Sequence, residues 1–476
     1  MNNEYLSFIK DYSKAILSGK ASLFIGSGIS RPANYVGWKE ILRECAEEIN
    51  LNVDREEKNL ITLAEYYVKS KQRTKITSAI RDFFADANGC PTKTHDLIAT
   101  LPIRNIWTTN YDRLLERIYT SHNIPYTVLT DDISYQNINP DAKVTIHKIH
   151  GDVLAPDKCI ITRGEYEEFE KTHDIVLSEL KGEMCSNSFL FLGYGFNDTD
   201  IQHILSKIRL IFSANNQPQR HYCIIEEVNI KDYETEQDYL YEKKKQEHHI
   251  NDMQSYGVNV ILVKSYNEIE NILSAINDVV LIKNVAISGA YEKGYTYENR
   301  ASETALKISR ELIKAGFNIY TGFGKNLGGD IVTGAFDGCT KVSKATEFKE
   351  RVHLFPMPYK KQPSEEQRSL YTKIRKNFIS KTRTTIIIAG KKKSNGSEIN
   401  SEGTLEEALL SIEQGNLILP IPTTGGTALS VYDKIIELNP SYSQQEDFKS
   451  LKSEVSPSKI AELVLRIIKN HIKEHK

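Results

Sequence analysis

The stretch "ASLFIGSGIS", Ala21–Ser30, decides the fold class of the first half of the chain. The apolar run up to Ile25 predicts a buried strand, and the Gly-Ser-Gly after it predicts a tight turn. Glycine lets the backbone turn sharply and approach a phosphate closely. Two interpretations stay open here: an ordinary strand–helix turn, or a loop that holds the phosphates of a nucleotide.

Strand-like runs and helical patterns alternate onward from this turn. The runs are "NIWTTN" (105–110), "VTIHKIHGD" (144–152), "SFLFLGYGF" (188–196), "RHYCIIEE" (220–227) and "VNVILV" (258–263), and helical patterns include Trp38–Ile49 and Asp198–Phe212. This alternation predicts an α/β fold with a parallel, doubly wound, Rossmann-type sheet. The segment Glu226–Asp252 is rich in both charge signs, which is typical of a solvated helix, with a flexible linker as the alternative.

A second α/β unit is expected to open near Asp278–Asn284, in "NDVVLIKNVAISGA". Further strands are expected in "FNIYTGFG" (317–324), "RVHLFPMP" (351–358), "TTIIIAG" (384–390) and "NLILPI" (416–421). A chain of 476 residues is too long for one ordinary core. We therefore expect two Rossmann-like domains, residues 1–282 and 283–476.

Composition excludes several classes of protein. The net charge is −2 and charged residues make up 26%, so no general field favours nucleic acid as a partner. No apolar run approaches about 18 residues, so no membrane span is expected. The N-terminus lacks a signal peptide's apolar core. Six cysteines without a CxxC pair predict reduced, buried thiols in a cytoplasmic protein, without a four-cysteine zinc site.

Polar or glycine residues stand at the ends of three of the expected strands. Asn110 and Asp112 follow the second, His150 the third and Gly193 and Gly195 the fourth. Because the carboxyl ends of parallel strands meet at one edge of a sheet, these residues are expected to line a nucleotide crevice. Asp112 has two open interpretations, a helix cap or a catalytic group.

This series resembles the sirtuin-type NAD-binding fold. The resemblance implies that NAD is bound by Gly26, Ser27, Gly28, Ser30, Gly193 and Gly195, and that Asn110, Asp112 and His150 are the catalytic amide, acid and base. Thr109 stands in the family's glutamine position, and the zinc-ribbon cysteine pairs are absent. These departures imply an enzyme that uses NAD itself as substrate, without zinc or another cofactor, and not a protein deacetylase.

That chemistry suits the residues. Cleavage of the N-glycosidic bond of NAD creates positive charge on the ribose, and nicotinamide leaves without a strong acid. Asn110 can orient a water or a ribose hydroxyl, and His150 can accept the proton. Asp112 could stabilise the cationic ribose or hold the asparagine loop.

The second half has its own glycine-rich strand ends. The expected ligand-contacting residues are Ser288, Gly289, Gly322 and Gly324, with Gly328 and Gly329 before a helix, and Gly403 and Thr404 at the start of another. Helix N-termini bind anions. Tight turns alone are the alternative for the glycines, and helix capping alone would explain Glu406 and Glu407 in an expected first turn.

The run "EGTLEE" resembles the signature of nucleoside-monophosphate phosphoribohydrolases and of the related sensor domains of the SLOG superfamily. Because "INSEG" replaces the enzymes' Pro-Gly-Gly, the resemblance implies ligand binding, in which Glu407 takes part, more than hydrolysis. In these folds a basic residue on the preceding helix faces a ribose phosphate. Arg375 is the preferred candidate, ahead of Lys373, Lys376 and Arg383, and Lys391 is placed for a phosphate as well.

A sirtuin-like domain followed by a SLOG domain resembles the ThsA effectors of the bacterial Thoeris antiphage system. The resemblance implies an NAD⁺ glycohydrolase that a cyclic ADP-ribose isomer activates by binding the SLOG domain. It further implies that a TIR-domain partner makes this isomer, that NAD depletion stops phage spread, and that the chain forms homotetramers. Two alternatives stay open: a nucleotide phosphoribohydrolase, and a nucleotide sensor without chemistry.

Overall fold

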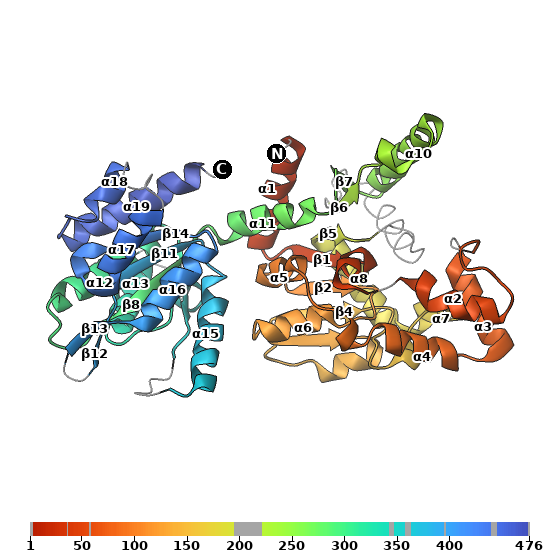
Figure 1. Ribbon diagram of the computed structural model, residues 1–476, viewed down its shortest axis with the longest axis horizontal. Coiled ribbons are helices and arrows are strands. Elements are labelled where there is room, and N and C mark those ends of the chain that lie inside the picture. The colour runs from red at the N-terminus through yellow and green to blue at the C-terminus, as the bar shows by residue number, and fades with distance from the viewer. Residues whose placement is uncertain are drawn as a thin grey trace. The chain divides into compact units, whose positions relative to one another are not determined.

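The computed structural model describes residues 3–35, 37–56, 59–194, 221–341, 347–357, 363–394, 397–438 and 445–474. The chain divides into two compact units, Met1–Val280 and Leu281–Lys476, and each is a parallel sheet flanked by helices (Figure 1). The expected α/β fold class is therefore confirmed. Among the described residues, no helix has both the length and the apolar character needed to cross a membrane.

The first unit is built on a seven-stranded sheet of order β3-β4-β2-β1-β5-β6-β7. Its strands are β1 (Ala21–Ile25), β2 (Asn105–Thr108), β3 (Tyr126–Leu129), β4 (Val144–Lys148), β5 (Ser188–Leu192), β6 (His221–Glu226) and β7 (Val258–Val263). Every pairing is parallel. All strands but β3 lie in runs that the sequence predicts. The order of strands reverses between β1 and β5, so the ligand crevice of such a fold is expected beyond their carboxyl ends.

Helices connect these strands. They are α1 (Asn3–Leu17), α2 (Trp38–Glu48), α3 (Leu60–Lys71), α4 (Thr74–Phe83), α5 (Lys93–Thr100), α6 (Leu114–Ser121), α7 (Arg163–Thr172), α8 (Asp174–Ser186), α10 (Glu236–Ser255) and α11 (Glu268–Leu281). α2 confirms the expected helix there. α10 confirms the solvated helix, because Met253 is its one buried residue among those described. The helix expected at Asp198–Phe212 lies outside the described residues.

Helices α2, α3, α4 and α7 form a group beside the sheet in Figure 1. Of these, α2, α3 and α4 share a hydrophobic core with the segments after β2 and β4. Tyr111, which directly follows Asn110, is 1% exposed, and its ring stacks on Trp38 at 6.3 Å and meets Phe84 at 5.7 Å between ring centroids. An anchored aromatic side chain thus fixes the backbone of the segment that carries the candidate catalytic amide.

The second unit has a five-stranded parallel sheet of order β10-β9-β8-β11-β14. Its strands are β8 (Asn284–Ala290), β9 (Asn318–Thr321), β10 (Val352–Leu354), β11 (Thr384–Ala389) and β14 (Leu417–Ile421), and a hairpin joins β12 (Lys391–Ser394) to β13 (Ser397–Asn400). The five sheet strands fall in the predicted runs, whereas the hairpin was not predicted. The strand order reverses between β8 and β11, which again predicts a crevice beyond their ends.

The helices of this unit are α12 (Glu298–Lys314), α13 (Leu327–Lys341), α14 (Phe348–Arg351), α15 (Glu365–Ile379), α16 (Glu402–Glu413), α17 (Gly426–Leu438), α18 (Glu446–Ser450) and α19 (Pro457–Glu474). One continuous apolar core fills the space between the sheet and α12, α13, α17 and α19. The prediction that Gly328 and Gly329 precede a helix is wrong, because both lie inside α13.

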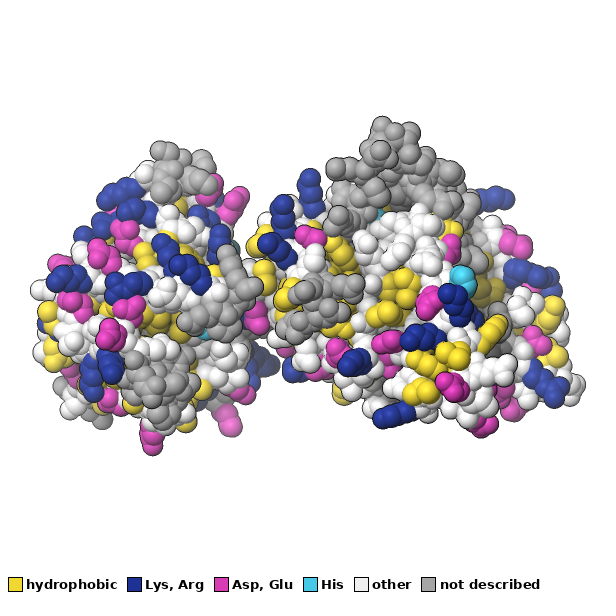
Figure 2. Space-filling model, turned by 90° about the horizontal axis from the view of Figure 1, so that it is seen from above, with side chains coloured by type: hydrophobic (Ala, Val, Ile, Leu, Met, Phe, Trp, Pro, Cys, Tyr) yellow, Lys and Arg dark blue, Asp and Glu magenta, His cyan; other side chains and the backbone are white. Residues whose placement is uncertain are grey.

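The surface charge agrees with the expectation from composition, whereas the burial of the cysteines agrees with it only in part. Basic and acidic side chains are interspersed over the face seen in Figure 2, in keeping with the net charge of −2. All six cysteines lie in the described residues and are free thiols. Cys45, Cys159, Cys223 and Cys339 are buried as expected, but Cys90 is exposed and Cys185 half-buried.

Candidate functional site

Asn110 and Asp112 meet the glycine loop through one hydroxyl group. Asn110 Nδ2 donates to Ser30 Oγ at 3.0 Å, and Ser30 Oγ donates to Asp112 Oδ2 at 2.7 Å. Asp112 Oδ1 accepts from the backbone N–H of Leu114, the first residue of α6, at 3.0 Å. One oxygen of Asp112 therefore orders the start of α6 and the other holds Ser30, and a catalytic role for Asp112 stays a prediction.

His150 lies just beyond the end of β4 and is 2% exposed. Its Nδ1 lies 3.3 Å from the hydroxyl of Tyr166, and the rings of Tyr166 and Phe169 pack edge-on against the imidazole. Both aromatic residues belong to α7. The helix thus holds the ring orientation, which a base needs if it is to face one fixed substrate atom.

Strand pairing brings the Asn110 and His150 segments to the same edge of the sheet. Thr108 at the end of β2 pairs with Lys148 at the end of β4, and Asn110 and His150 each lie two residues further on. The two segments are joined again by a hydrogen bond from Val153 N to Tyr111 O at 3.0 Å. The candidate amide and base therefore occupy equivalent positions on neighbouring strands.

The glycines of the first loop serve the packing of two loops. Gly26 N donates to Leu192 O at 2.8 Å and Gly28 N to Gly193 O at 3.0 Å. A Cβ at Gly26 would collide with the Gly193 carbonyl, and one at Gly28 would lie 2.8 Å from Gly193 Cα. The loops after β1 and β5 thus meet backbone to backbone. Gly195 lies outside the described residues.

A cavity of about 840 Å³ opens beside these loops. Ser27, Gly28 and Gly193 line it, together with Lys245 and His249 of α10. Its volume lies in the range of about 300–1,000 Å³ that is typical of ligand pockets. Asn110, Asp112 and His150 lie outside its described lining, and the loop that lines it reaches Asn110 and Asp112 through Ser30.

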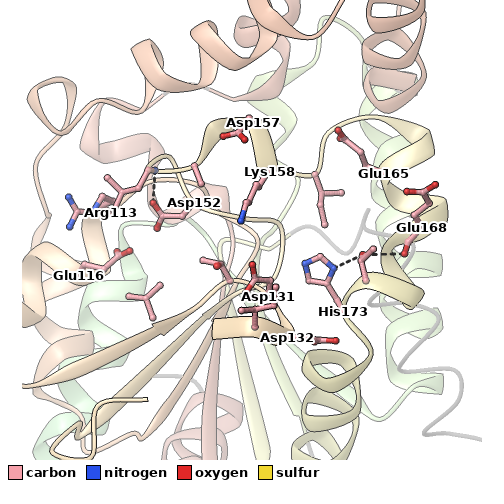
Figure 3. A pocket seen from close by; sticks show the side chains of 18 of the residues that line it. Arg113, Glu116, Asp131, Asp132, Asp152, Asp157, Lys158, Glu165, Glu168 and His173 are labelled. Carbon is pink, nitrogen blue, oxygen red and sulfur yellow. Dashed lines mark hydrogen bonds between the residues drawn. The ribbon is translucent and has the colours of Figure 1, made fainter. Parts of the chain in front are cut away.

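A second cavity, of about 730 Å³, lies at the carboxyl ends of β3 and β4 (Figure 3). Its charged lining residues are Glu116, Asp131, Asp132, Asp152, Asp157, Glu165 and Glu168, opposed by Arg113 and Lys158. So many carboxylates disfavour a pyrophosphate. The phosphates of a dinucleotide therefore fit better in the cavity beside the glycine loop.

A buried lysine, which sequence reasoning missed, lies between the two candidate catalytic segments. Lys148 is 1% exposed, and its Nζ lies 3.1 Å from Glu116 Oε1 and 2.6 Å from Asp152 Oδ2. Burial lowers the pKa of Lys148, but the neighbouring carboxylates outweigh burial and raise it. The ammonium group is thus charged in the folded protein. The position of Lys148 two residues before His150 could have marked it as part of the site. Nothing in the sequence identifies Glu116 and Asp152 as its partners.

In the second unit, the expected ligand residues gather around Glu407. The Ser288 hydroxyl donates to Glu407, and Arg375 Nε lies 3.4 Å from Glu407 Oε1. Arg375 Nη1 also pairs with Glu406 Oε2 at 2.6 Å. Burial raises the pKa of Glu407, while Ser288 and Arg375 lower it less. The guanidinium is therefore balanced by two carboxylates, and a phosphate would have to share it.

The glycines close this cluster. Gly403 faces Arg375, since a Cβ there would lie 2.6 Å from Arg375 Nη2. Similarly, a Cβ at Gly322 would lie 3.2 Å from Glu407 Oε1, and one at Gly324 would collide with the Gly289 carbonyl. All seven of these expected residues thus belong to one site. Lys391 lies against Gly426 at the start of α17.

The expected position of Glu406 and Glu407 is wrong in one respect. α16 begins at Glu402, so both lie in its second turn, where the helix dipole does not explain them. A loop at Gly425 and Gly426 also contributes to this edge of the sheet and was missed, although Gly-Gly is a strong turn signal. Both glycines have positive φ, and Tyr295 donates its hydroxyl to Thr424 O beside them at 2.8 Å.

The chain is similar to known proteins over nearly its whole length. The protein is 32% identical over 437 residues to NAD(+) hydrolase ThsA of Bacillus cereus (strain MSX-D12), covering 90% of this chain and 89% of that protein. It is 30% identical to NAD(+) hydrolase ThsA of Cytobacillus dafuensis (97% of this chain, 95% of that one) and 31% identical to that of Acinetobacter baumannii (strain 532279) (96% and 97%). The chain belongs to the ThsA family.

Two domain families match within this chain. Residues 104–250 match the SIR2-like domain, and this range contains Asn110, Asp112 and His150. Residues 268–471 match the Sir2- and TIR-associating SLOG family, a range that contains Ser288, Arg375 and Glu407. The chain thus joins a SIR2-like domain to a SLOG domain, as the sequence predicts.

Proposed function

We propose that the first of the two expected domains, residues 1–282, hydrolyses NAD⁺ to nicotinamide and ADP-ribose. The observation that carries this proposal is the placement of Asn110 and His150 at the ends of two paired strands, with Ser30 joining Asn110 to the loop beside the larger cavity. The names of the relatives, NAD(+) hydrolases, support the same activity. In this scheme the glycine loop and Gly193 hold the pyrophosphate, and NAD⁺ is substrate, not cofactor.

The reaction needs one bond broken and one formed. The bond between ribose C1′ and the pyridinium nitrogen breaks, and its electron pair neutralises the leaving nicotinamide. A water oxygen then bonds to C1′ and His150 accepts its proton. Asn110 orients the water or a ribose hydroxyl, and Asp112 stabilises the positive ribose through the buried carboxylate that also holds Ser30.

The second expected domain, residues 283–476, is proposed to be the sensor that switches this activity on. Its ligand would be a cyclic ADP-ribose isomer made by a TIR-domain partner, bound by the cluster of Ser288, Arg375 and Glu407 with Lys391 beyond it. Arg375 offers a planar fork suited to phosphate. The chain would act as a cytoplasmic homotetramer. Its activity would deplete NAD in the cell and so stop phage spread.

Gating is required because an unregulated NAD hydrolase would harm its own cell. A ligand activates only if it binds the active arrangement more tightly than the resting one. A hundredfold shift in that equilibrium needs a difference in binding free energy of about 2.7 kcal/mol. A few charge-assisted hydrogen bonds are of this magnitude.

The test follows nicotinamide release from NAD⁺ by chromatography, with and without individual cyclic ADP-ribose isomers. The wild-type chain should release nicotinamide only when one isomer is present. Asn110→Ala and His150→Ala should abolish nicotinamide release. Arg375→Ala should no longer be activated by the isomer. Light scattering on the same samples gives the oligomeric state.

Three results would contradict the proposal in distinct ways. Full turnover by His150→Ala would remove the assigned base. NAD⁺ binding without nicotinamide release under every condition would favour a sensor without chemistry. Base release from a nucleoside monophosphate that Glu407→Gln abolishes, with NAD⁺ untouched, would move catalysis to the second unit.

A further inference from the structure

Lys148 holds the segment that carries Asn110. Its Nζ donates to the backbone carbonyls of Tyr111 at 3.1 Å and of Asp112 at 2.5 Å, and the side chain is 1% exposed. Both carbonyls lie directly after Asn110. One ammonium group on β4 therefore fixes the backbone that follows β2, in a place that solvent scarcely reaches.

The same ammonium group closes the turn that carries His150. Its Nζ donates to Asp152 Oδ2 at 2.6 Å, so the residues two before and two after His150 are joined across the turn. Asp152 Oδ1 accepts from Leu154 N at 2.7 Å, which fixes the carboxylate at both oxygens. Figure 3 shows Asp152 and Glu116 on the same side of the smaller cavity.

Charge neutralisation alone does not account for this arrangement. Lys148 lies between two buried carboxylates, Glu116 (3% exposed) and Asp152 (7% exposed), and a buried charge without a partner is costly. Two carboxylates already offer more negative charge than one ammonium group needs, so neutralisation does not call for the two carbonyl contacts. The ammonium group instead shares its three N–H bonds among two carboxylates and two carbonyls, and the carbonyls belong to the catalytic segment.

We propose that Lys148 is a positioning residue for NAD⁺ hydrolysis: it sets the spacing between the Asn110 amide and the His150 imidazole by binding the backbone of one segment and closing the turn of the other. This inference rests on the proposed function. Lys148 acts through other residues, so its loss changes the geometry of the reacting groups and leaves the grip on the dinucleotide intact. A misplacement of about 1 Å can cost about a hundredfold in rate.

The experiment measures kcat, KM and melting temperature of the full chain with its activating cyclic ADP-ribose isomer. Lys148→Met should lower kcat at least about tenfold, with KM within about threefold of wild type. Lys148→Arg keeps the charge that the buried carboxylates require, but its planar fork cannot reproduce the contacts, so it should fold and still lose kcat. Lys75→Met is the matched control, because Lys75 pairs with Glu48 at 2.6 Å and with Glu44 at 3.0 Å in the same unit.

A charge-neutral triple variant separates positioning from neutralisation. Lys148→Met with Glu116→Gln and Asp152→Asn should regain the melting temperature that Lys148→Met loses, while kcat stays low. Recovery of kcat together with melting temperature would assign Lys148 to neutralisation and overturn the inference, as would wild-type kcat in Lys148→Arg.

His150→Ala, assayed in parallel, separates this inference from the proposed function. If His150→Ala is inactive while the Lys148 variants keep wild-type kcat, only the positioning role fails. If His150→Ala keeps full turnover, the proposed site fails, and the role of Lys148 fails with it.

Discussion

The side-chain amide of Asn110 donates to the hydroxyl of Ser30 at 3.0 Å, which ties the segment after β2 to the glycine loop after β1. The same hydroxyl donates to Asp112 Oδ2 at 2.7 Å. Ser30 is 4% exposed, so water does not readily replace it. One hydroxyl group therefore sets the orientation of the amide and of the acid, and joins both to the loop that lines the larger cavity.

Ser30→Ala should lower the turnover of NAD⁺ by about tenfold or more, equivalent to about 1.4 kcal/mol of activation free energy. The amide and the carboxylate would lose their common partner while the backbone stays in place. Ser70→Ala is the control, because the exposed Ser70 hydroxyl binds only the Tyr66 carbonyl within α3 among the contacts seen in the described residues. Steady-state assays of both variants decide, and equal turnover in the two would contradict the role of Ser30.

Gly193→Ala should destabilise the first unit by more than about 2 kcal/mol. Gly193 has a φ of +63°, and a Cβ there would lie 2.5 Å from Ile29 N, a backbone atom that cannot move aside. Denaturant unfolding measures the loss. Gly182→Ala is the matched control within α8, where an added Cβ has nothing within 4 Å, and it should be neutral or stabilising by up to about 1 kcal/mol. A Gly193→Ala curve that overlays wild type would contradict the packing described.

Fully buried parallel strands were predictable from the sequence. β1 and β5 are apolar apart from one serine each, and all their residues are buried, as expected of strands covered on both faces of a parallel sheet. β3 was missed because it is a short edge strand in which only Thr127 and Leu129 are buried. β13 was missed because all four of its residues are exposed, so no apolar pattern marks it.

The part of the candidate site that lies at the ends of the strands was predictable from the sequence. Asn110 and His150 stand out because polar residues directly follow apolar strands. Lys148 could not be found in this way, since its role depends on Tyr111, Asp112 and Asp152, which approach it only in the folded chain. Glu407 was found only through the resemblance of "EGTLEE" to a known signature, and its contacts with Ser288 and Arg375 could not be predicted because these residues approach it only in the folded chain.

Acid should destabilise the first unit through buried histidines such as His147. Burial lowers the pKa of His147 from 6.5 to about 3, and its ring stacks on Trp107 at 3.8 Å between centroids. The unfolded chain then takes up a proton below pH 6.5 that the folded chain refuses, so stability is present above that pH and is lost as pH falls. From pH 7.5 to 5.5 this one residue should cost about 1.4 kcal/mol.

His147→Phe isolates this contribution. Phenylalanine keeps an aromatic ring against Trp107 and cannot be protonated, so the variant should lose less stability between pH 7.5 and 5.5 than wild type by about 1.4 kcal/mol. Urea unfolding at the two pH values gives the difference. His248→Phe, at an exposed position of α10, should keep the wild-type dependence. The account of His147 is wrong if its variant shows the same pH dependence as wild type.

Gly403→Ala should impair activation of the chain without affecting its folding. The added Cβ would lie 2.6 Å from Arg375 Nη2, and the end of a flexible side chain can move away from it. That movement would pull the guanidinium from Glu406 and Glu407, to which it is bound at 2.6 and 3.4 Å.

Because we propose that this guanidinium meets a ligand phosphate, half-maximal activation should require at least about tenfold more of the cyclic ADP-ribose isomer, equivalent to about 1.4 kcal/mol of binding free energy. Gly182→Ala in α8, where an added Cβ has nothing within 4 Å, should activate as wild type does. Titration of nicotinamide release against the isomer measures both variants, and a wild-type titration curve for Gly403→Ala would remove Arg375 from the proposed ligand site.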